Sequence, residues 1–159
     1  MNLNAIVKQF FVENDFDKLA QNISVVRNDG VVIFSNSENF NDSYTVGALV
    51  GGLWQAADAL NSMVSKDQSV LEYRLSFDTS EQGIYVLPFS LQEKVYFICA
   101  IYNEVSNPAL LKRNLRNLKD TLYFYLKEIA FEQGKTRNGF LFEHITDEEI
   151  DRLFKISEL

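Results

Sequence analysis

The chain has 159 residues, of which 47% are apolar and 13% aromatic, and its formal net charge is −7. This apolar content is enough for one packed core and excludes a disordered chain. A net negative surface repels nucleic-acid phosphates and anionic lipid heads, so we expect no nucleic-acid partner. The first residues lack the basic and apolar segments of a signal peptide, and no apolar run approaches ~18 residues, which predicts a cytoplasmic protein without membrane insertion.

The predicted elements follow in the order helix, two strands, helix, three strands and helix. Apolar residues at three- and four-residue spacing indicate the helices, and alternating or β-branched runs indicate the strands. The expected bounds are 3–20, 23–27, 31–35, 46–64, 70–77, 84–89, 94–102 and 107–132. Asp29-Gly30 supplies the positive φ angles of a tight hairpin turn. We expect Ser43 or Thr45 to cap the second helix and Gly134 to end the last one.

The middle helix carries two stripes. The first stripe consists of apolar residues that are expected to sit on the sheet, namely Leu49, Leu53, Ala56, Leu60 and Val64. The second stripe consists of small residues, namely Gly47, Ala48, Gly51, Gly52, Ala56 and Ala59. Each helical glycine costs roughly 1 kcal/mol relative to alanine, so the close approach of another backbone must offset that cost. This backbone belongs either to the sheet of the same chain or to a second copy of the helix.

The element order, the Asp29-Gly30 turn and the Gly-Ala-Leu-Val-Gly-Gly-Leu run at 47–53 resemble the Roadblock (dynein light chain) family over about residues 3–132. The resemblance implies an α/β (α+β) domain. Its five-stranded antiparallel sheet would carry the middle helix on one face and the terminal helices on the other. It also implies dimerisation through the middle helix and the third strand. Members bind small GTPases or act as scaffolds, as do the bacterial MglB-type regulators of Ras-like polarity GTPases.

The expected dimer or partner interface combines the small-residue stripe with nearby positions of the helix and third strand. Its residues are Gly47, Ala48, Gly51, Gly52, Trp54, Gln55, Asp58, Ala59, Glu72 and Arg74. Trp54 is either an aromatic at the edge of the core or an interface anchor. The last helix holds a basic patch of Lys112, Arg113, Arg116 and Lys119. That patch is either a solvated face or a docking site for an acidic partner, including the tail of the same chain.

The tail beyond the domain is acidic. Residues 143–159 contain six Asp or Glu against Arg152 and Lys155. Thr146 and Glu149 fit a capping box, and the expected docking residues are Ile145, Ile150, Leu153 and Phe154. Because so short a helix is marginal alone, this face should dock on its own domain, on a dimer mate or on a partner. The segment is also similar to the Glu-Ile-Asp-x-Leu start of flagellar switch proteins, which engages a response regulator.

The expected organisation is a roadblock-like domain at 1–133, a hinge at 134–144 and an acidic amphipathic tail helix at 145–159.

Residues for catalysis are scarce. The chain has one histidine, His144 in the tail, and one cysteine, Cys99, in an apolar run where we expect a buried thiol. No spaced Cys, His and carboxylate set suggests a metal, and Gly47-x-x-x-Gly51-Gly52 lacks the Gly-Lys-Ser/Thr ending of a phosphate loop. We therefore expect a non-enzyme without cofactors.

Taken with the resemblance, these residues favour a homodimer that binds or regulates a small Ras-like GTPase in bacterial polarity or motility signalling. The main alternative is a scaffold or adaptor that recognises a response regulator, or another signalling protein, through its acidic tail. A ligand-sensing domain with a small-molecule pocket is a third possibility.

Overall fold

The computed structural model describes residues 2–37, 40–64 and 73–142. The elements are α1 (Leu3–Glu13), η1 (Phe16–Lys18), β1 (Asn22–Arg27), β2 (Val32–Ser35), α2 (Phe40–Ser62), β3 (Leu75–Asp78), β4 (Gly83–Leu91), β5 (Lys94–Tyr102) and α3 (Pro108–Phe142). Their order and their mixed class are as the sequence predicts.

The strands form one antiparallel sheet in the order β2-β1-β5-β4-β3. Gly30 in the β1–β2 turn has φ 85°, whereas Asp29 does not take a positive φ, so the turn forms as predicted but only its glycine is left-handed. Gln92 and Glu93 join β4 to β5 with φ 49° and 66°, so both residues take the left-handed conformation that matches a two-residue hairpin turn to the twist of its strands.

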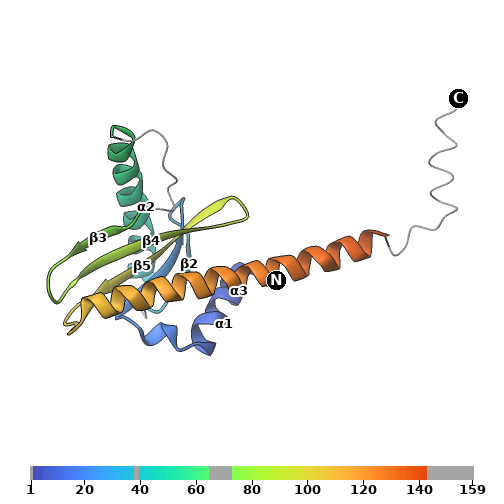
Figure 1. Ribbon diagram of the computed structural model, residues 1–159, viewed down its shortest axis with the longest axis horizontal. Helices are drawn as coiled ribbons and strands as arrows, with labels where there is room; N and C mark the ends of the chain where they lie inside the picture. Colours follow the sequence, from blue (N-terminus) through green and yellow to red (C-terminus); the bar gives the residue numbers. More distant parts are fainter. Residues whose placement is uncertain (1, 38–39, 65–72, 143–159) are drawn as a thin grey trace, which may run out of the picture. The chain divides into compact units, whose positions relative to one another are not determined.

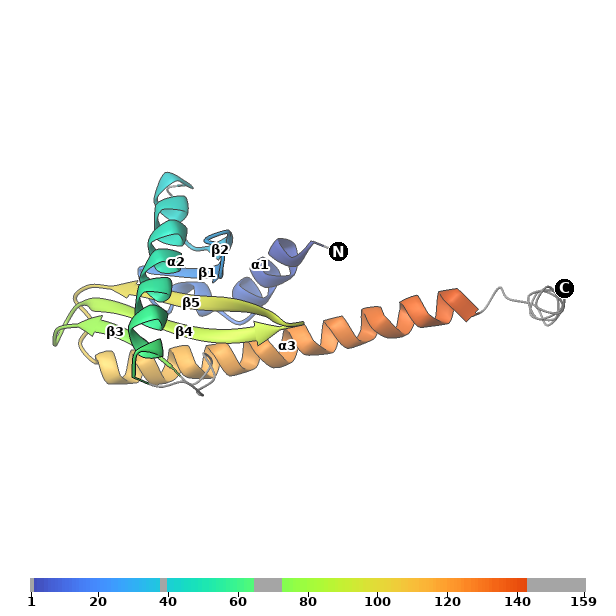
Figure 2. The same cartoon turned by 90° about the horizontal axis from the view of Figure 1, so that it is seen from above.

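Helices cover both faces of the sheet (Figures 1 and 2), with α2 on one face and α1 and the first part of α3 on the other. The period of two along β5 divides its residues between the layers. Phe97 and Cys99 belong to the cluster under α2. Tyr102, of opposite parity, bonds to the network that reaches α3. On the same side Phe11 of α1 stacks on Phe34 of β2, with 4.0 Å between ring centroids.

The chain divides into two compact units, Met1–Phe124 and Tyr125–Leu159. The first holds the sheet, α1, α2 and the beginning of α3. The described part of the second, residues 125–142, is helical.

Several predicted boundaries are wrong. Asp15 takes φ 55°, which ends α1 at Glu13 and leaves only the short η1 beyond it. Helix α2 begins at Phe40, so Ser43 and Thr45 lie within it and are not caps. Helix α3 continues through Gly134 to Phe142, because a single glycine costs a helix only about 1 kcal/mol. It therefore includes most of the segment expected to be a hinge.

The third strand begins at Leu75 instead of residue 70, and Tyr73 and Arg74 before it are not in a strand. The first part of the predicted strand lies outside the described residues, as does the tail at 143–159.

The side of α2 that packs on the sheet is the small-residue side. A Cβ atom at Gly47 would overlap the Gly30 carbonyl oxygen and lie 2.7 Å from Val32 Cγ2. One turn further, a Cβ at Gly51 would lie 3.6 Å from Gly30 Cα. The backbone that comes close to α2 at these two glycines is therefore that of the β1–β2 hairpin in the same chain.

Val50 and Trp54 continue this inward side of α2 into the core. They form a buried cluster with Val26, Val86, Phe97 and Cys99. The stripe of larger residues, expected to lie on the sheet, faces outward, so that prediction is wrong. Leu49, Leu60 and Val64 are each at least 65% exposed. Hydrophobicity alone does not decide which face of this helix is buried, because only the glycine side fits against the hairpin.

The two kinds of glycine on α2 give a matched pair of variants. Gly47→Ala should lower the free energy of unfolding by about 1–3 kcal/mol, because the new methyl group meets a backbone oxygen that cannot move aside cheaply. Gly52→Ala should raise it by up to about 1 kcal/mol, because nothing lies within 4 Å of the added Cβ and alanine is the better helix former. Urea unfolding curves measure both. A Gly47→Ala protein as stable as wild type would contradict the packing described.

Candidate partner-binding surface

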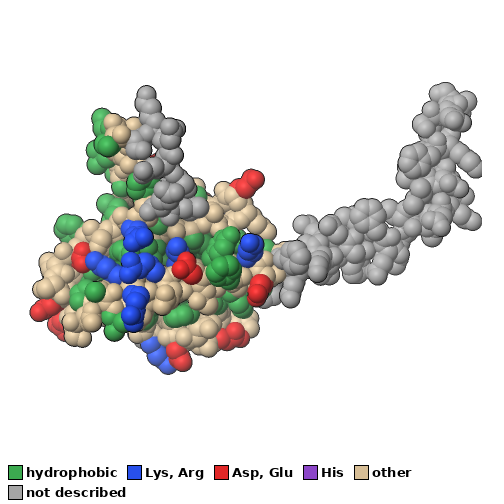
Figure 3. All heavy atoms as spheres, in the orientation of Figure 1, with side chains coloured by type: hydrophobic (Ala, Val, Ile, Leu, Met, Phe, Trp, Pro, Cys, Tyr) green, Lys and Arg blue, Asp and Glu red, His purple; other side chains and the backbone are tan. Residues whose placement is uncertain are grey.

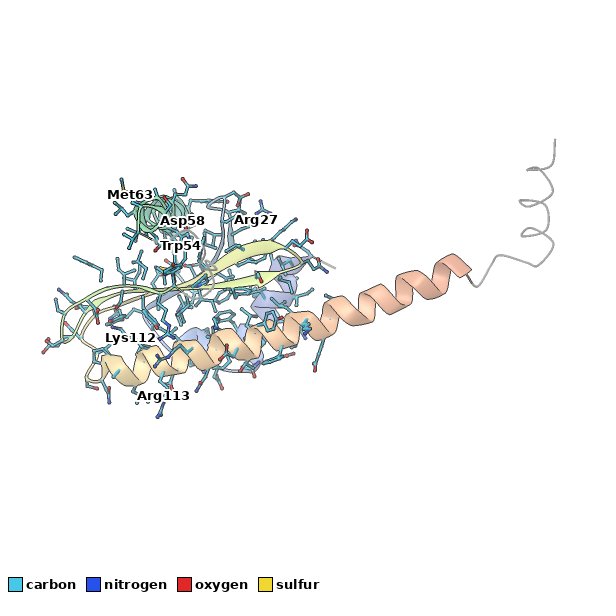
Figure 4. The ribbon with its side chains drawn as sticks, turned by 45° about the horizontal axis from the view of Figure 1, so that its top comes forward. Arg27, Trp54, Asp58, Met63, Lys112 and Arg113 are labelled. Carbon is cyan, nitrogen blue, oxygen red and sulfur yellow. The ribbon has the colours of Figure 1, made fainter. Side chains whose placement is uncertain are left out.

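The outward side of α2 is apolar. Three side chains on it and two in the turn that follows the helix, which we call the leucine face, are between 42% and 89% exposed: Leu49, Leu53, Leu60, Met63 and Val64. Met63 projects from the free side of the helix, away from the sheet (Figure 4). Contiguous exposed apolar groups on a folded protein mark interaction sites more often than solvated surface.

The spacing of these residues indicates what kind of partner they fit. Leu49, Leu53, Ala56, Leu60 and Met63 alternate steps of four and three residues, the 3.5-residue repeat of a seam between two helices. At about 3.6 residues per turn, Ala48, Gly52 and Ala59 fall on the strip beside the leucine face, and all three are exposed. The large side chains of the leucine face thus lie next to a row of small residues, over which large side chains of a partner could pack.

Strand β3 extends this surface. It is the last strand of the sheet order, so among the described residues one of its sides has no neighbouring strand. Phe77 pairs with Ile84, which packs against the cluster under α2, so Phe77 lies on the face of the sheet that α2 covers. Its side chain is 78% exposed. The edge strand and the leucine face therefore border the same side of the domain.

Trp54 is a core residue of this chain. Only 8% exposed, it points from α2 toward the sheet (Figure 4), and its ring centroid lies 4.7 Å from that of Phe97. Its Nε1 is buried and has no hydrogen-bond partner in the part of the chain that the structure describes. Trp54 also lines a hollow of about 110 Å³ between α2 and the chain entering β3, together with Ala57, Asp58, Asn61, Tyr73, Arg74 and Leu75.

The remaining residues of the expected interface divide into two groups. Gly47 and Gly51 are covered by the β1–β2 hairpin. The exposed members are Ala48, Gly52, Gln55, Asp58, Ala59 and Arg74. Glu72 lies outside the described residues. Sequence reasoning missed the outward leucines as interface residues, although their 3.5-residue spacing is visible in the sequence.

A polar network joins β3 to α3. Asp78 accepts hydrogen bonds from Tyr102 Oη at 3.1 Å, from Ser76 Oγ at 2.8 Å and from Lys112 Nζ at 2.5 Å. Lys112 Nζ also lies 5.5 Å from the centroid of the Tyr85 ring. The bond from Lys112 is the main reason that the pKa of Asp78 is lowered, with the Ser76 bond next. Burial, followed by the Asp78 bond, raises the pKa of Tyr102 to about 12.

The predicted basic residues lie in the first part of α3, and we call Lys112, Arg113, Arg116 and Lys119 the basic face. Lys and Arg side chains gather in the middle of the surface on which α3 lies (Figure 3). Lys112 points toward the sheet while Arg113 points away from it (Figure 4). Lys119 pairs with Asp120 at 3.1 Å. Within the described part of the chain, Arg113 and Arg116 have no ion pair.

Neither the thiol nor the carboxylates form a reactive centre in the described ranges. Burial raises the pKa of Cys99 to about 12, so the thiolate is scarcely populated at neutral pH. Among residues 2–37, 40–64 and 73–142, no three His, Cys, Asp or Glu side chains are close enough to share a metal ion. In the same ranges, no helix combines the length and apolarity needed to cross a bilayer.

Structure comparison identifies the fold. The chain is similar to Myxococcus xanthus MglB with a TM-score of 0.57 and 16% sequence identity, over 80% of this chain and 89% of that one. No protein-family model and no curated protein sequence matches it. The element order, the sheet and this likeness show a roadblock-type fold.

The Asp78 network predicts a pH dependence. The pKa of Asp78 is lowered in the folded protein, so its stabilising effect is present above the unfolded value of about 3.9 and is lost as pH falls through the folded value. Asp78→Asn should therefore be less stable than wild type near neutral pH, and the difference should shrink toward about pH 3.

Thermal unfolding across this pH range measures the effect. Asp120→Asn is the control, because it removes only an exposed pair with Lys119 and should change stability little. A constant difference between Asp78→Asn and wild type at every pH would show that the carboxylate charge plays no part.

Proposed function

We propose that this chain is a non-catalytic, homodimeric roadblock-type module that binds or regulates a small Ras-like GTPase in bacterial polarity or motility signalling. The observation that carries the proposal is the exposed leucine face on the middle helix of a roadblock-type fold. The likeness to MglB supports the fold, and the chemistry of the surface supports the role of binding another protein.

A second copy of the same chain fits the leucine face because the surface is complementary to itself. In a two-fold dimer the same patch must face its own copy. Leu53 and Leu60 of one chain could pack over the strip of Ala48, Gly52 and Ala59 of the other, and the reverse contact would follow by symmetry. Burying one large aliphatic side chain contributes about 1.5–3 kcal/mol, so a few such contacts suffice for a stable pair.

The edge strand fits the same arrangement. Beside α2, β3 offers main-chain groups on its free side, and Phe77 adds a large exposed ring. Edge strands with free donors and acceptors are prone to pair with another chain unless something covers them. Pairing of β3 with β3 of a second copy would extend the sheet and bury Phe77 beside the two helices.

A GTPase would then meet a surface composed of two copies. In this proposal the dimer acts by holding the switch loops of the GTPase in one conformation, and it supplies no catalytic residue of its own. Such an effect depends on the difference in affinity between the GTP-bound and GDP-bound forms. The proposal therefore requires that the chain distinguish the two nucleotide states.

Leu53→Asp tests the dimer, because it places a charge in the middle of the seam. Multi-angle light scattering should give twice the chain mass of 18.3 kDa for wild type and a single chain mass for the variant. Val12→Asp is the matched control, since Val12 is an exposed apolar residue on α1, across the sheet from α2, and should leave the dimer intact. A wild-type protein that remains monomeric at high concentration would rule out the shared seam.

The GTPase is tested by affinity capture from a lysate of the source bacterium, loaded either with GDP or with a non-hydrolysable GTP analogue. We expect a Ras-like GTPase to be enriched by the immobilised protein in one nucleotide state and not in the other. Single-turnover hydrolysis with the purified pair then shows whether the chain changes the rate. Recovery of a response regulator and no GTPase in either state would favour the adaptor role instead.

A further inference from the structure

The hollow beside Trp54 combines an apolar interior with charged groups at its edge. About 110 Å³ in volume, it lies between α2 and the residues that lead into β3. Trp54 is buried, and the other apolar groups of the lining come from three half-buried residues, Ala57, Tyr73 and Leu75. The lining belongs wholly to the first compact unit, so the hollow is a feature of the domain itself.

Two opposite charges lie at the edge of this hollow. Asp58 follows Trp54 by about one turn of α2, and Arg74 comes directly before β3; both residues are exposed. Neither has an ion pair within the described ranges, so the two charges do not neutralise each other. A sphere of this volume is only about 6 Å across, so one small molecule in the hollow is near both groups. The edge therefore offers a carboxylate and a guanidinium group to the same ligand.

The interior adds hydrogen-bonding groups. Trp54 Nε1 is a donor that is buried and has no hydrogen-bond partner among the described residues. Buried polar groups nearly always have a partner, and an exception indicates a place where water, an ion or a ligand supplies it. Because Trp54 lines the hollow, an oxygen atom of a bound molecule can be that acceptor. Asn61, half-buried on the next turn after Asp58, adds an amide that both donates and accepts.

The size and lining of the hollow limit the apolar part of a ligand. An apolar cavity of about 150 Å³ holds one benzene molecule. At about 110 Å³, this hollow fits a side chain of three or four carbon atoms and is too small for an aromatic ring. Such a side chain also matches the apolar groups of Ala57 and Leu75. The ligand should therefore be small and aliphatic at one end and carry both charges at the other.

We propose that this hollow binds a free α-amino acid with an aliphatic side chain of three or four carbon atoms. Its ammonium group pairs with Asp58, its carboxylate accepts hydrogen bonds from Arg74 and Trp54 Nε1, and its side chain enters the hollow. A few placed polar groups around an apolar pocket are the usual design of a small-molecule site. All of these groups belong to one chain, so binding requires neither the proposed dimer nor a GTPase.

Fluorescence of Trp54 tests the site directly, because Trp54 is the only tryptophan of the chain. Titration of the full chain with L-valine, L-leucine and L-isoleucine should change the emission saturably for at least one of them, and isothermal titration calorimetry should give the same dissociation constant. Two analogues of leucine dissect the charges: 4-methylpentanoate lacks the ammonium group and 3-methylbutylamine lacks the carboxylate. Each should bind about ten-fold more weakly, the scale of one charged hydrogen bond. No saturable response to any of the three amino acids by either method would overturn the proposal.

Exposed residues at the edge give variants that should fold normally. Asp58→Asn and Arg74→Gln should each raise the dissociation constant for the bound amino acid about ten-fold. Arg113→Gln is the matched control, because Arg113 is an exposed arginine without an ion pair in the described ranges and lies on α3, across the sheet from α2. Leu53→Asp retains every lining residue and should also bind, so failure of the dimer leaves this test valid. Unchanged binding in Asp58→Asn and Arg74→Gln, or an equal loss in Arg113→Gln, would overturn the assignment.

Discussion

The close approach of α2 to the β1–β2 hairpin is the constraint on which the rest of this structure depends. At Gly47 there is no room for a side chain between the helix and the Gly30 carbonyl group. Because this contact fixes which side of α2 faces the sheet, it also fixes that Trp54 is buried and Leu53 is outside. The leucine face is exposed for a steric reason, even though its residues are large and apolar.

The sequence contains enough local information to predict the elements but not the orientation of α2. The Asp29-Gly30 pair predicts a hairpin turn, in which Gly30 takes the positive φ, and the alternation along β5 fixes which side chains share a face. By contrast, α2 has apolar residues on two sides. Periodicity locates both sets but does not decide which of them is buried. The choice between those sides depends on Gly30 and Val32, which meet the helix only after the hairpin has folded. That contact is not visible in the spacing of residues on α2.

The candidate surface was also only partly predictable, because spacing along one helix is visible in the sequence and long-range contacts are not. Lys112, Arg113, Arg116 and Lys119 lie within a few turns of one helix, so their nearness in space follows from the sequence alone. The network around Asp78 joins residues that are 24 and 34 positions apart and could not be inferred from spacing. The network ties the edge strand β3 to α3 and so holds β3 in place. A second chain could pair with the outer edge of β3.

The two faces of the sheet therefore carry surfaces of different chemistry. On the α2 side the surface is apolar, and it is the one that we propose to pair with another copy of the same helix. On the α3 side it carries the basic face beside a hollow lined by aromatic residues. Since the sheet separates them, occupation of one does not block the other sterically. A dimer joined through α2, as proposed above, would therefore retain the basic face of each copy.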